Sequence, residues 1–323
     1  MGLYLKVRTP LSTGNLQQNF DPKPNKKDRV NQRRRRMTFS KQRKQFRNYL
    51  NGPNIGYPVS VFDPISARIA DHLKIDLGIL GGSVASAAIL AAPDIMVLTL
   101  SELSDQVERI CRVSDISLMV DADNGYGNAL NASRTIQELE RAGAAAITIE
   151  DAALPPQYGS SDTSLISCDE MIGKLRAAID AKRDPNTVII ARTNGLSSTS
   201  LDDTSKRVSA YSNLNVDAIM IVGAKEYGDI ESIRKNTHLP LVLGSASDKL
   251  KENSFLLKNN VKVVLTGHQP FFTTMKTLYD SLKHLKDGGN PSALKEQSIA
   301  TELENAILHS GEYRQQQQDY LSH

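Results

Sequence analysis

The stretch ISLMVDADNGYGNALNASRTIQELERAGAAAITIED, residues 116–151, contains the pattern that decides the fold. The apolar run 116–123 ends at a turn with two glycines, a helical pattern covers 128–142, and a second apolar run covers 145–151. Nearly continuous apolar strands linked by a helix are typical of parallel sheets that are buried on both faces. These residues therefore predict a strand, a helix and a second strand parallel to the first.

The same rhythm of strand and helix repeats along the chain from about residue 58. Eight strands are predicted at 58–63, 77–82, 116–123, 145–151, 187–193, 216–223, 240–245 and 261–267, with helices at 101–113, 128–142, 169–182, 201–213 and 269–285 among them. Eight such units predict a (β/α)8 TIM barrel. An open doubly wound sheet is the alternative, but no G-x-G-x-x-G sequence follows the first strand and no Walker A sequence occurs.

A further helix with an apolar stripe is predicted from Pro291 onward, beyond what a barrel requires. This extra C-terminal helix should pack on a neighbouring subunit or cover one end of the barrel. The run Gln315–Gln318 is predicted to be its frayed, polar end.

The composition is that of a globular protein with a basic tail. Hydrophobic residues make up 40% of the 323, which is enough for a sizeable core. No stretch has the roughly 18 consecutive apolar residues of a membrane span, and residues 1–20 lack the apolar region of a secretory signal. We therefore expect a cytoplasmic protein, with Cys111 and Cys168 as free thiols that pack as small hydrophobic residues.

The positive charge lies in residues 1–36, which carry a net +8 and leave −5 for residues 37–323. This segment has no helical or strand periodicity, so we predict a disordered basic extension, 1–36, followed by one catalytic domain, 37–323. A contact with nucleic acid or another anionic surface, and an organelle transit peptide, are alternative functions for the extension. A solvated extension is the favoured interpretation.

Reactive side chains gather at the predicted carboxyl ends of the strands, which form the open mouth of such a barrel. They are Asp63, Gly81, Gly82, Ser83, Asp121, Asp123, Glu150, Asp151, Arg192, Ser245 and His268. Asp63 and Asp151 are explained equally well as N-caps of the following helices, and a capping role is the alternative for His268. The coincidence of carboxylates, a guanidinium, a hydroxyl and an imidazole at one level of the barrel indicates an active site.

Asp121 and Asp123 lie two residues apart on a predicted strand, so both side chains should point to the same face. Two adjacent carboxylates without His or Cys favour Mg²⁺, with Mn²⁺ as a second choice. Glu150, on the next strand, is placed to hold a water on that metal. An EF-hand does not fit, because the glycine stands at the fifth position of the loop and Ala132 at the twelfth.

Arg192 and the Gly-Gly-Ser turn indicate an anionic substrate. The guanidinium of Arg192 suits bidentate binding of a carboxylate. Gly82 and Ser83 let backbone N–H groups approach a negatively charged oxygen.

These residues, in this order, resemble the isocitrate lyase and phosphoenolpyruvate mutase superfamily, and within it the oxaloacetate decarboxylase family. The resemblance is carried by SVFDPISARIADHL (60–73), LGGSVASAAILAAPDIMVLTLSEL (80–103), VDADNGYGNALNASRTIQELERAGAAAITIED (120–151), IIARTN (189–194) and VVLTGHQPFF (263–272). It implies that Asp121 binds Mg²⁺, that Asp123 and Glu150 hold metal-bound waters, and that Ser83, Arg192 and His268 bind substrate. Relatives commonly form tetramers, so a homotetramer or dimer is expected.

The chain departs from this superfamily at three places. The lyases carry a catalytic cysteine after the fourth strand, whereas here the loop reads AALPPQYGSSDTSLIS and Cys168 falls at the start of the next helix. Asn194 stands where relatives often have an acid. Ser245 stands where an aromatic residue near the substrate is expected.

The favoured hypothesis is Mg²⁺-dependent decarboxylation of oxaloacetate, or a close 2-oxo diacid, to pyruvate and CO₂. Arg192 would bind a carboxylate, Ser83 would hold developing oxyanion charge, and His268 would orient substrate or relay a proton. The alternative is a C–C lyase or phosphonate-acting enzyme of the same superfamily with a substituted malate-like substrate. A barrel with little activity that binds nucleic acid through its tail is a third, disfavoured hypothesis.

Overall fold

The computed structural model describes residues 39–156, 158–159, 164–245, 247, 249–250 and 252–321. The predicted disordered extension, 1–36, lies outside the described residues. The chain from Phe39 to His323 forms one compact unit.

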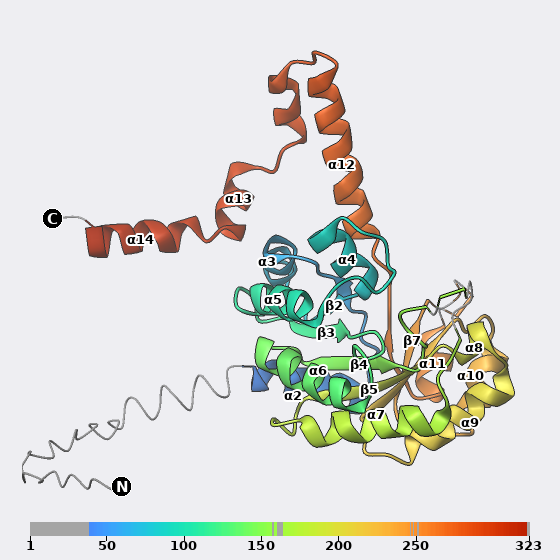
Figure 1. Ribbon diagram of the computed structural model, residues 1–323. Coiled ribbons are helices and arrows are strands. Elements are labelled where there is room, and N and C mark those ends of the chain that lie inside the picture. Colours follow the sequence, from blue (N-terminus) through green and yellow to red (C-terminus); the bar gives the residue numbers. More distant parts are fainter. Residues whose placement is uncertain are drawn as a thin grey trace, which may run out of the picture. The chain divides into compact units, whose positions relative to one another are not determined.

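All eight predicted strands are present and form one parallel sheet in sequence order (Figure 1). Their bounds are β1 Val59–Ser60, β2 Leu77–Leu80, β3 Ser117–Asp121, β4 Ala146–Glu150, β5 Val188–Thr193, β6 Ala218–Val222, β7 Leu241–Gly244 and β8 Val261–Val264. Gly56, just before β1, forms a parallel bridge with Val263 of β8. This bridge joins the last strand to the start of the first, so the predicted (β/α)8 barrel is confirmed.

Helices follow the strands as predicted. They are α3 Pro64–His72, α4 Gly82–Leu90, α5 Leu100–Cys111, α6 Ala129–Ala142, α7 Cys168–Ala181, α8 Gly195–Ser198, α9 Leu201–Ser212, α10 Tyr227–Arg234, α11 Asn253–Lys258 and α12 Gln269–Lys286. Helix α6 shows why the bounds fall where they do. The Asn128 side chain accepts hydrogen bonds from the N–H groups of Leu130 and Asn131, and the helix ends at Gly143 with φ 115°. A side-chain cap starts the helix and a left-handed glycine ends it.

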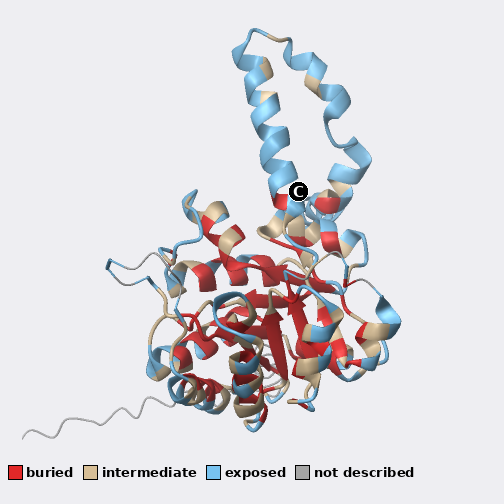
Figure 2. Cartoon of the chain, turned by 90° about the vertical axis from the view of Figure 1, so that its right-hand side faces the viewer, coloured by how far each residue is buried: buried red, intermediate tan, exposed pale blue. Residues whose placement is uncertain are grey.

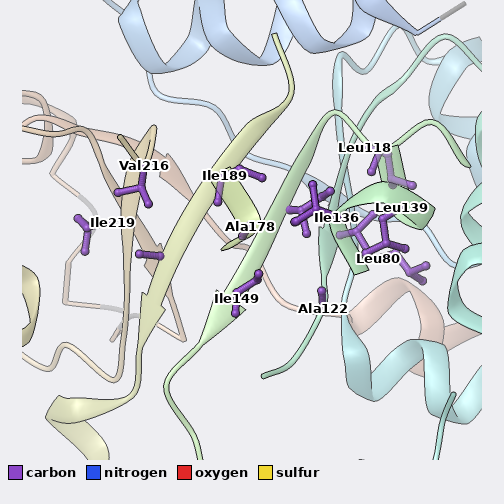
Figure 3. Packing of buried hydrophobic residues seen from close by; sticks show 14 of the residues in the cluster. Leu80, Leu118, Ala122, Ile136, Leu139, Ile149, Ala178, Ile189, Val216 and Ile219 are labelled. Carbon is purple, nitrogen blue, oxygen red and sulfur yellow. The ribbon is translucent and has the colours of Figure 1, made fainter. Parts of the chain in front are cut away.

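Alternate strand residues build two separate cores. One set, including Leu118, Ile149 and Ile189, packs outward against the helices (Figure 3). The other set, including Met119 and Ile190, points into the barrel. This alternation follows from the two-residue period of a strand, and it fixes which residues at the strand ends face inward.

Helix α2, Ser40–Asn51, has no counterpart among the sequence predictions. Its Phe46 and Leu50 are buried in the interior core of the barrel. The buried guanidinium of Arg43 donates to the backbone oxygen of Ala144 at 3.2 Å and to Asp184 Oδ2 at 2.9 Å. Helix α2 is therefore held to the loops on the amino side of β4 and β5, where it closes that end of the barrel.

The C-terminal region differs from its prediction. In place of one helix from Pro291, the chain forms a 3₁₀ segment, Pro291–Gln297, followed by α13, Thr301–Ile307, and α14, Ser310–Leu321. Gln315–Gln318, predicted to fray, lies inside α14, because glutamine is a good helix former. Figure 2 shows α12 to α14 largely exposed beside the buried barrel. No helix in the described ranges is long and apolar enough to cross a membrane.

Candidate active site

A cavity of about 720 Å³ opens at the carboxyl ends of the strands. Its walls include seven of the predicted strand-end residues: Gly81, Gly82, Ser83, Asp121, Arg192, Ser245 and His268. A neighbouring cavity is lined by the remaining predicted metal residues, Asp123 and Glu150, and shares Asp121 and Arg192 with the first. The structure therefore brings the predicted metal-binding and substrate-binding groups together at one end of the barrel.

Arg192 lies between two of the predicted metal ligands. Its Nη1 donates to Asp121 Oδ2 at 2.6 Å, and its Nε lies 2.9 Å from Glu150 Oε2. The N–H of Nε makes no hydrogen bond to the described residues, because it does not point at that oxygen. Thr148 donates to the other oxygen of Asp121 at 3.0 Å. Asp121 and Arg192 thus reach the cavity as an oriented ion pair.

Asp123 reaches the site by a route that the sequence prediction had wrong. Strand β3 ends at Asp121, and Asp123 has a left-handed backbone with φ 46°, so the two acids are not on one face of a strand. Gly125 and Gly127 also have positive φ, which turns the chain sharply after the strand. Short polar residues adopt the left-handed conformation more readily than most, and here it returns the Asp123 side chain to the same end of the barrel.

The carboxylates at this site carry more negative charge than Arg192 balances. Burial, together with the neighbouring charges of Asp121, Glu150 and Asp94, raises the pKa of Asp123 to about 8. Burial also raises the pKa of Asp94, followed by the charge of Asp121. Four acids surround one guanidinium, so the pocket is electrostatically prepared for a cation.

His268 is fixed from two sides. Its Nδ1 lies 2.8 Å from Ser60 Oγ on β1. A Cβ on Gly81 would come within 2.4 Å of Nε2, so only glycine at this position leaves room for the ring. His268 occupies the N-cap position of α12 but its side chain makes no capping hydrogen bond, which leaves the imidazole for the cavity. Burial lowers the pKa of His268, so the ring is neutral near pH 7.

The Gly-Gly-Ser turn begins a helix, as an oxyanion-binding role requires. Helix α4 starts at Gly82, with Gly81 as its N-cap, and Ser83 lines the cavity beside them. A Cβ on Gly82 would lie 2.8 Å from Asp123 Oδ1. Glycine at 82 therefore allows the helix start and the metal acids to approach each other closely.

Asp63 and Asp151 were each predicted to be either a site residue or a helix N-cap, and the structure gives a different answer for each. Asp63 caps α3 by accepting from the N–H of Ser66 at 2.7 Å, so its role is structural. Asp151 caps no helix, because α7 is capped by Ser167.

Asp151 is instead the centre of a buried polar network. Its carboxylate accepts hydrogen bonds from Thr193 Oγ1 at 2.8 Å, the Asn194 N–H at 3.1 Å and the Tyr211 hydroxyl at 3.1 Å. Arg207 Nη1 lies 3.4 Å away. The network joins the end of β4, next to Glu150, to the end of β5, next to Arg192.

Sequence reasoning missed Asp94 and Ser60. Asp94 lies in the loop after α4, away from every strand end, although it lines both cavities. Ser60 is in β1 itself and reads as an ordinary strand residue. Asn194, noted as a departure, donates to Glu150 Oε2 at 2.8 Å and is part of the site. Ser60 could have been found from its place on the first strand, because the first and eighth strands are neighbours in a closed barrel and His268 follows the eighth.

Neither cysteine belongs to the site. Cys111 is buried and Cys168 is the first residue of α7, and neither lines the two cavities. Burial raises the pKa of both thiols, which disfavours a reactive thiolate. The prediction that both are free, packed thiols is confirmed.

Comparison with known proteins places these observations in a family. The phosphoenolpyruvate phosphomutase family model matches residues 46–286. Phosphoenolpyruvate phosphomutase from Streptomyces platensis subsp. rosaceus superposes with a TM-score of 0.77 at 25% identity, covering 86% of this chain and 99% of that one. Phosphonopyruvate hydrolase in complex with oxalate and Mg²⁺ has the same fold, with a TM-score of 0.76 at 24% identity, covering 87% of this chain and 99% of that one. The chain belongs to the phosphoenolpyruvate mutase and isocitrate lyase superfamily.

Curated relatives narrow this assignment. Oxaloacetate decarboxylase from Bradyrhizobium diazoefficiens is 44% identical over 285 residues, which cover 88% of this chain and 99% of the relative. Oxaloacetate decarboxylase from a strain of Rhodopseudomonas palustris is 46% identical over 258 residues, covering 80% and 90%. Within the superfamily, the chain is a member of the oxaloacetate decarboxylase family.

Proposed function

We propose that this protein catalyses the decarboxylation of oxaloacetate, or a close 2-oxo diacid, to pyruvate and CO₂, with Mg²⁺ as cofactor and Mn²⁺ as a possible substitute. The observation that carries the proposal is the Arg192–Asp121 pair, which lines a cavity at the strand ends together with Ser83 and His268. The names of the relatives agree with this reaction. The absence of both cysteines from the cavity walls argues against the alternative, a C–C lyase that uses a thiol.

The residues present fit a Mg²⁺ ion. Carboxylate oxygens are its preferred protein ligands, and it is usually held by one or two of them together with water and substrate. The described residues contain no cluster of three or more His, Cys, Asp or Glu side chains in position to ligate an ion. In this proposal Asp121 binds the ion directly, and Asp123 and Glu150 accept hydrogen bonds from its waters. The high pKa of Asp123 supports the need for positive charge here.

The chain's own groups would bind and orient the diacid and supply its proton. The chemistry that Mg²⁺ supplies when bound is Lewis-acid polarisation of the 2-oxo group. Arg192 binds a substrate carboxylate through its fork of donors. Ser83 and the N–H groups at the start of α4 stabilise oxyanion charge as CO₂ leaves. His268, held by Ser60, is neutral near pH 7 and orients the substrate or relays the proton that C3 receives.

Pyruvate release from oxaloacetate is the direct test. We expect pyruvate to form far faster than in an enzyme-free blank, to stop on addition of a chelator, and to resume when Mg²⁺ is restored. Coupling to lactate dehydrogenase measures the pyruvate. A rate equal to the blank, with the protein folded and Mg²⁺ present, would contradict the proposal.

Mg²⁺ binding should release protons, and the release should depend on pH. Without the ion, Asp123 in the folded protein has a pKa of about 8, whereas in the unfolded chain its pKa is near the ordinary value of 3.8. The folded apo protein therefore binds more protons than the unfolded chain between these values and loses stability as the pH rises towards 8. Mg²⁺ favours the ionised acid, so the gain in Tm on adding Mg²⁺ should be larger at pH 8 than at pH 6. Calorimetry in two buffers of different ionisation enthalpy measures the released proton. An Asp123→Asn variant serves as control, because it should release fewer protons than the unaltered protein.

We also propose that the protein is a homotetramer or dimer. Large apolar side chains form a stripe along α12: Phe272, Met275, Leu278, Tyr279 and Leu282, each at least half exposed. An apolar stripe of this length on one helix marks a protein–protein contact. Light scattering should give a mass of two or four chains, and Leu278→Glu with Leu282→Glu should reduce it. A monomeric mass for the unaltered chain would contradict this assembly. The cytoplasmic location and the solvated role of residues 1–36 stay predictions.

A further inference from the structure

Ser60 and His268, here called the Ser–His pair, share a hydrogen bond beside the active-site cavity. Ser60 Oγ lies 2.8 Å from His268 Nδ1. Either atom could donate, because a neutral imidazole carries its one proton on Nδ1 or on Nε2. The direction of this hydrogen bond therefore decides which nitrogen of His268 holds the proton, and what the ring offers to a substrate.

The segments on either side hold the Ser–His pair in place. Two residues before each member, Thr266 Oγ1 donates to the backbone oxygen of Pro58 at 3.2 Å. Just beyond each member, the rings of Phe62 and Phe271 pack edge to face with centroids 5.1 Å apart. The hydrogen bond of the Ser–His pair is therefore part of a packed contact between β1 and the start of α12.

The Ser60 hydroxyl has one acceptor within reach. Ser60 is 5% exposed, and among the described residues its Oγ makes no hydrogen bond other than the one with Nδ1. If Nδ1 donated, the Ser60 proton would be buried without an acceptor, which is unfavourable. If Ser60 donates, both atoms are satisfied, because Nδ1 then accepts with its lone pair. The neutral ring then carries its proton on Nε2.

Nε2 is on the side of the ring that faces the cavity. A Cβ on Gly81, which also lines the cavity, would lie 2.4 Å from Nε2. The carboxylates of Asp121 and Asp94 act on the ring through their charge. A donor at Nε2 suits these carboxylates and the oxygens of a diacid substrate, whereas a lone pair at Nε2 would be repelled by both.

We propose that Ser60 donates the hydrogen bond to His268 Nδ1, and that the neutral ring donates a hydrogen bond from Nε2 to an oxygen of the substrate. Ser60 is then a positioning residue, and His268 orients the substrate. His268 does not relay a proton, because the described residues offer no group beyond Ser60 that would return a proton to Nδ1. In the proposed decarboxylation C3 then takes its proton from water. The identity of the substrate rests on that proposed function, but the direction of the Ser60 hydrogen bond does not.

Nitrogen NMR of the protein with isotope-labelled histidines and with Mg²⁺ present shows which nitrogen carries the proton. The chain has six histidines, and a His268→Gln variant identifies the signals of His268. We expect a proton on Nε2 and none on Nδ1, and we expect oxalate, used as a mimic of the enolate, to shift the Nε2–H signal. A proton on Nδ1, or an Nε2–H signal that oxalate leaves unchanged, would overturn the inference.

Variants of Ser60 connect this hydrogen bond to the reaction. Ser60→Ala should shift the Nδ1 signal and lower kcat/KM for oxaloacetate by about three- to tenfold, the usual effect of losing one neutral hydrogen bond. Ser60→Thr keeps the hydroxyl and suits a strand, so it should restore both the signal and the rate. A folded Ser60→Ala variant with the signal and the rate of the unaltered protein would contradict the role of Ser60.

Ser117→Ala is the matched control. Ser117 is also a buried strand serine, but its hydroxyl donates to the backbone oxygen of Gln42 at 2.8 Å, and it lines neither cavity. It should leave the His268 signals and kcat/KM as they are. Turnover of oxaloacetate together with a proton on Nδ1 would overturn this inference and leave the decarboxylase function standing. A proton on Nε2 in a folded protein that does not turn over oxaloacetate would overturn the decarboxylation and leave the Ser60 hydrogen bond standing.

Discussion

Replacing Asp121 with alanine should lower kcat/KM for oxaloacetate by on the order of 10³-fold or more. Lewis-acid stabilisation by a bound metal is worth several kcal/mol, and each 1.36 kcal/mol corresponds to about a factor of ten. Asp121 is the proposed direct ligand, and its loss also leaves Arg192 Nη1 without the partner that it has at 2.6 Å. Steady-state pyruvate release at saturating Mg²⁺ measures the effect. Raising Mg²⁺ further should not restore the rate.

The variants Asp121→Asn and Asp63→Asn show whether the charge of the Asp121 carboxylate, and not only the size of its side chain, is needed for activity. Asn at 121 keeps the size of the side chain but removes the carboxylate, so its activity should fall nearly as far as that of the alanine variant. Asp63 is also an acid at a strand end, but it caps α3, and asparagine caps helices as well as aspartate does. Asp63→Asn should therefore keep its activity within about twofold. More than a tenth of the original activity in Asp121→Ala would exclude Asp121 as the essential ligand.

Replacing Arg207 with methionine should reduce the free energy of unfolding by about 3–5 kcal/mol, the usual cost of removing one partner of a buried ion pair. Asp151 is completely buried and would lose its charged neighbour. Arg207 Nη1 also donates to the Ile166 backbone oxygen at 3.0 Å, and its Nε donates to Asp203 at 2.8 Å. Urea unfolding followed by circular dichroism measures the change.

The adjacent residue provides the control for Arg207. Lys206 is also on α9 and pairs with Asp202 at 2.6 Å, but both side chains are exposed to solvent. Exposed pairs of this kind contribute little, so Lys206→Met should unfold at the same urea concentration as the unaltered protein. Arg207→Met should also lower kcat, because Asp151 ties together the strand ends that carry Glu150 and Arg192. Equal stability of the two variants would show that the buried network does not support the fold.

The barrel was predictable because each strand contains a buried apolar run of its own. Near-continuous runs such as 145–151 have no other stable place than a sheet covered on both faces. Asp121 and Arg192 were predictable for the same reason, since strand ends in such a barrel converge at one mouth. Neither prediction needed knowledge of a long-range contact.

The features that escaped prediction depend on contacts between distant segments. Asp94 belongs to a loop, and only the folded chain brings it beside Asp121. The left-handed turn at Asp123 replaces a strand continuation, and nothing in an alternating pattern marks that change. Helix α2 has a mostly polar sequence. Its few apolar residues, Phe46 among them, are buried because they fill one end of the barrel. The local periodicity of a sequence does not indicate which distant segments will come into contact.

The alternation of inward and outward side chains has a consequence for how enzymes of this fold diversify. Several strands contribute a terminal inward residue, such as Asp121, Arg192 or Val222, that lies on packed neighbours and lines the cavity. Exchanging Asp121, Arg192 or Val222 for another side chain disturbs the packed layers little, whereas inserting a single residue within a strand would direct its reactive group into the helices. A new activity can therefore arise by point substitution at these few strand-end positions, whereas an insertion or deletion within a strand would misplace the strand-end side chain. The residues proposed to carry the reaction therefore occupy positions that contribute little to the packed layers of the barrel.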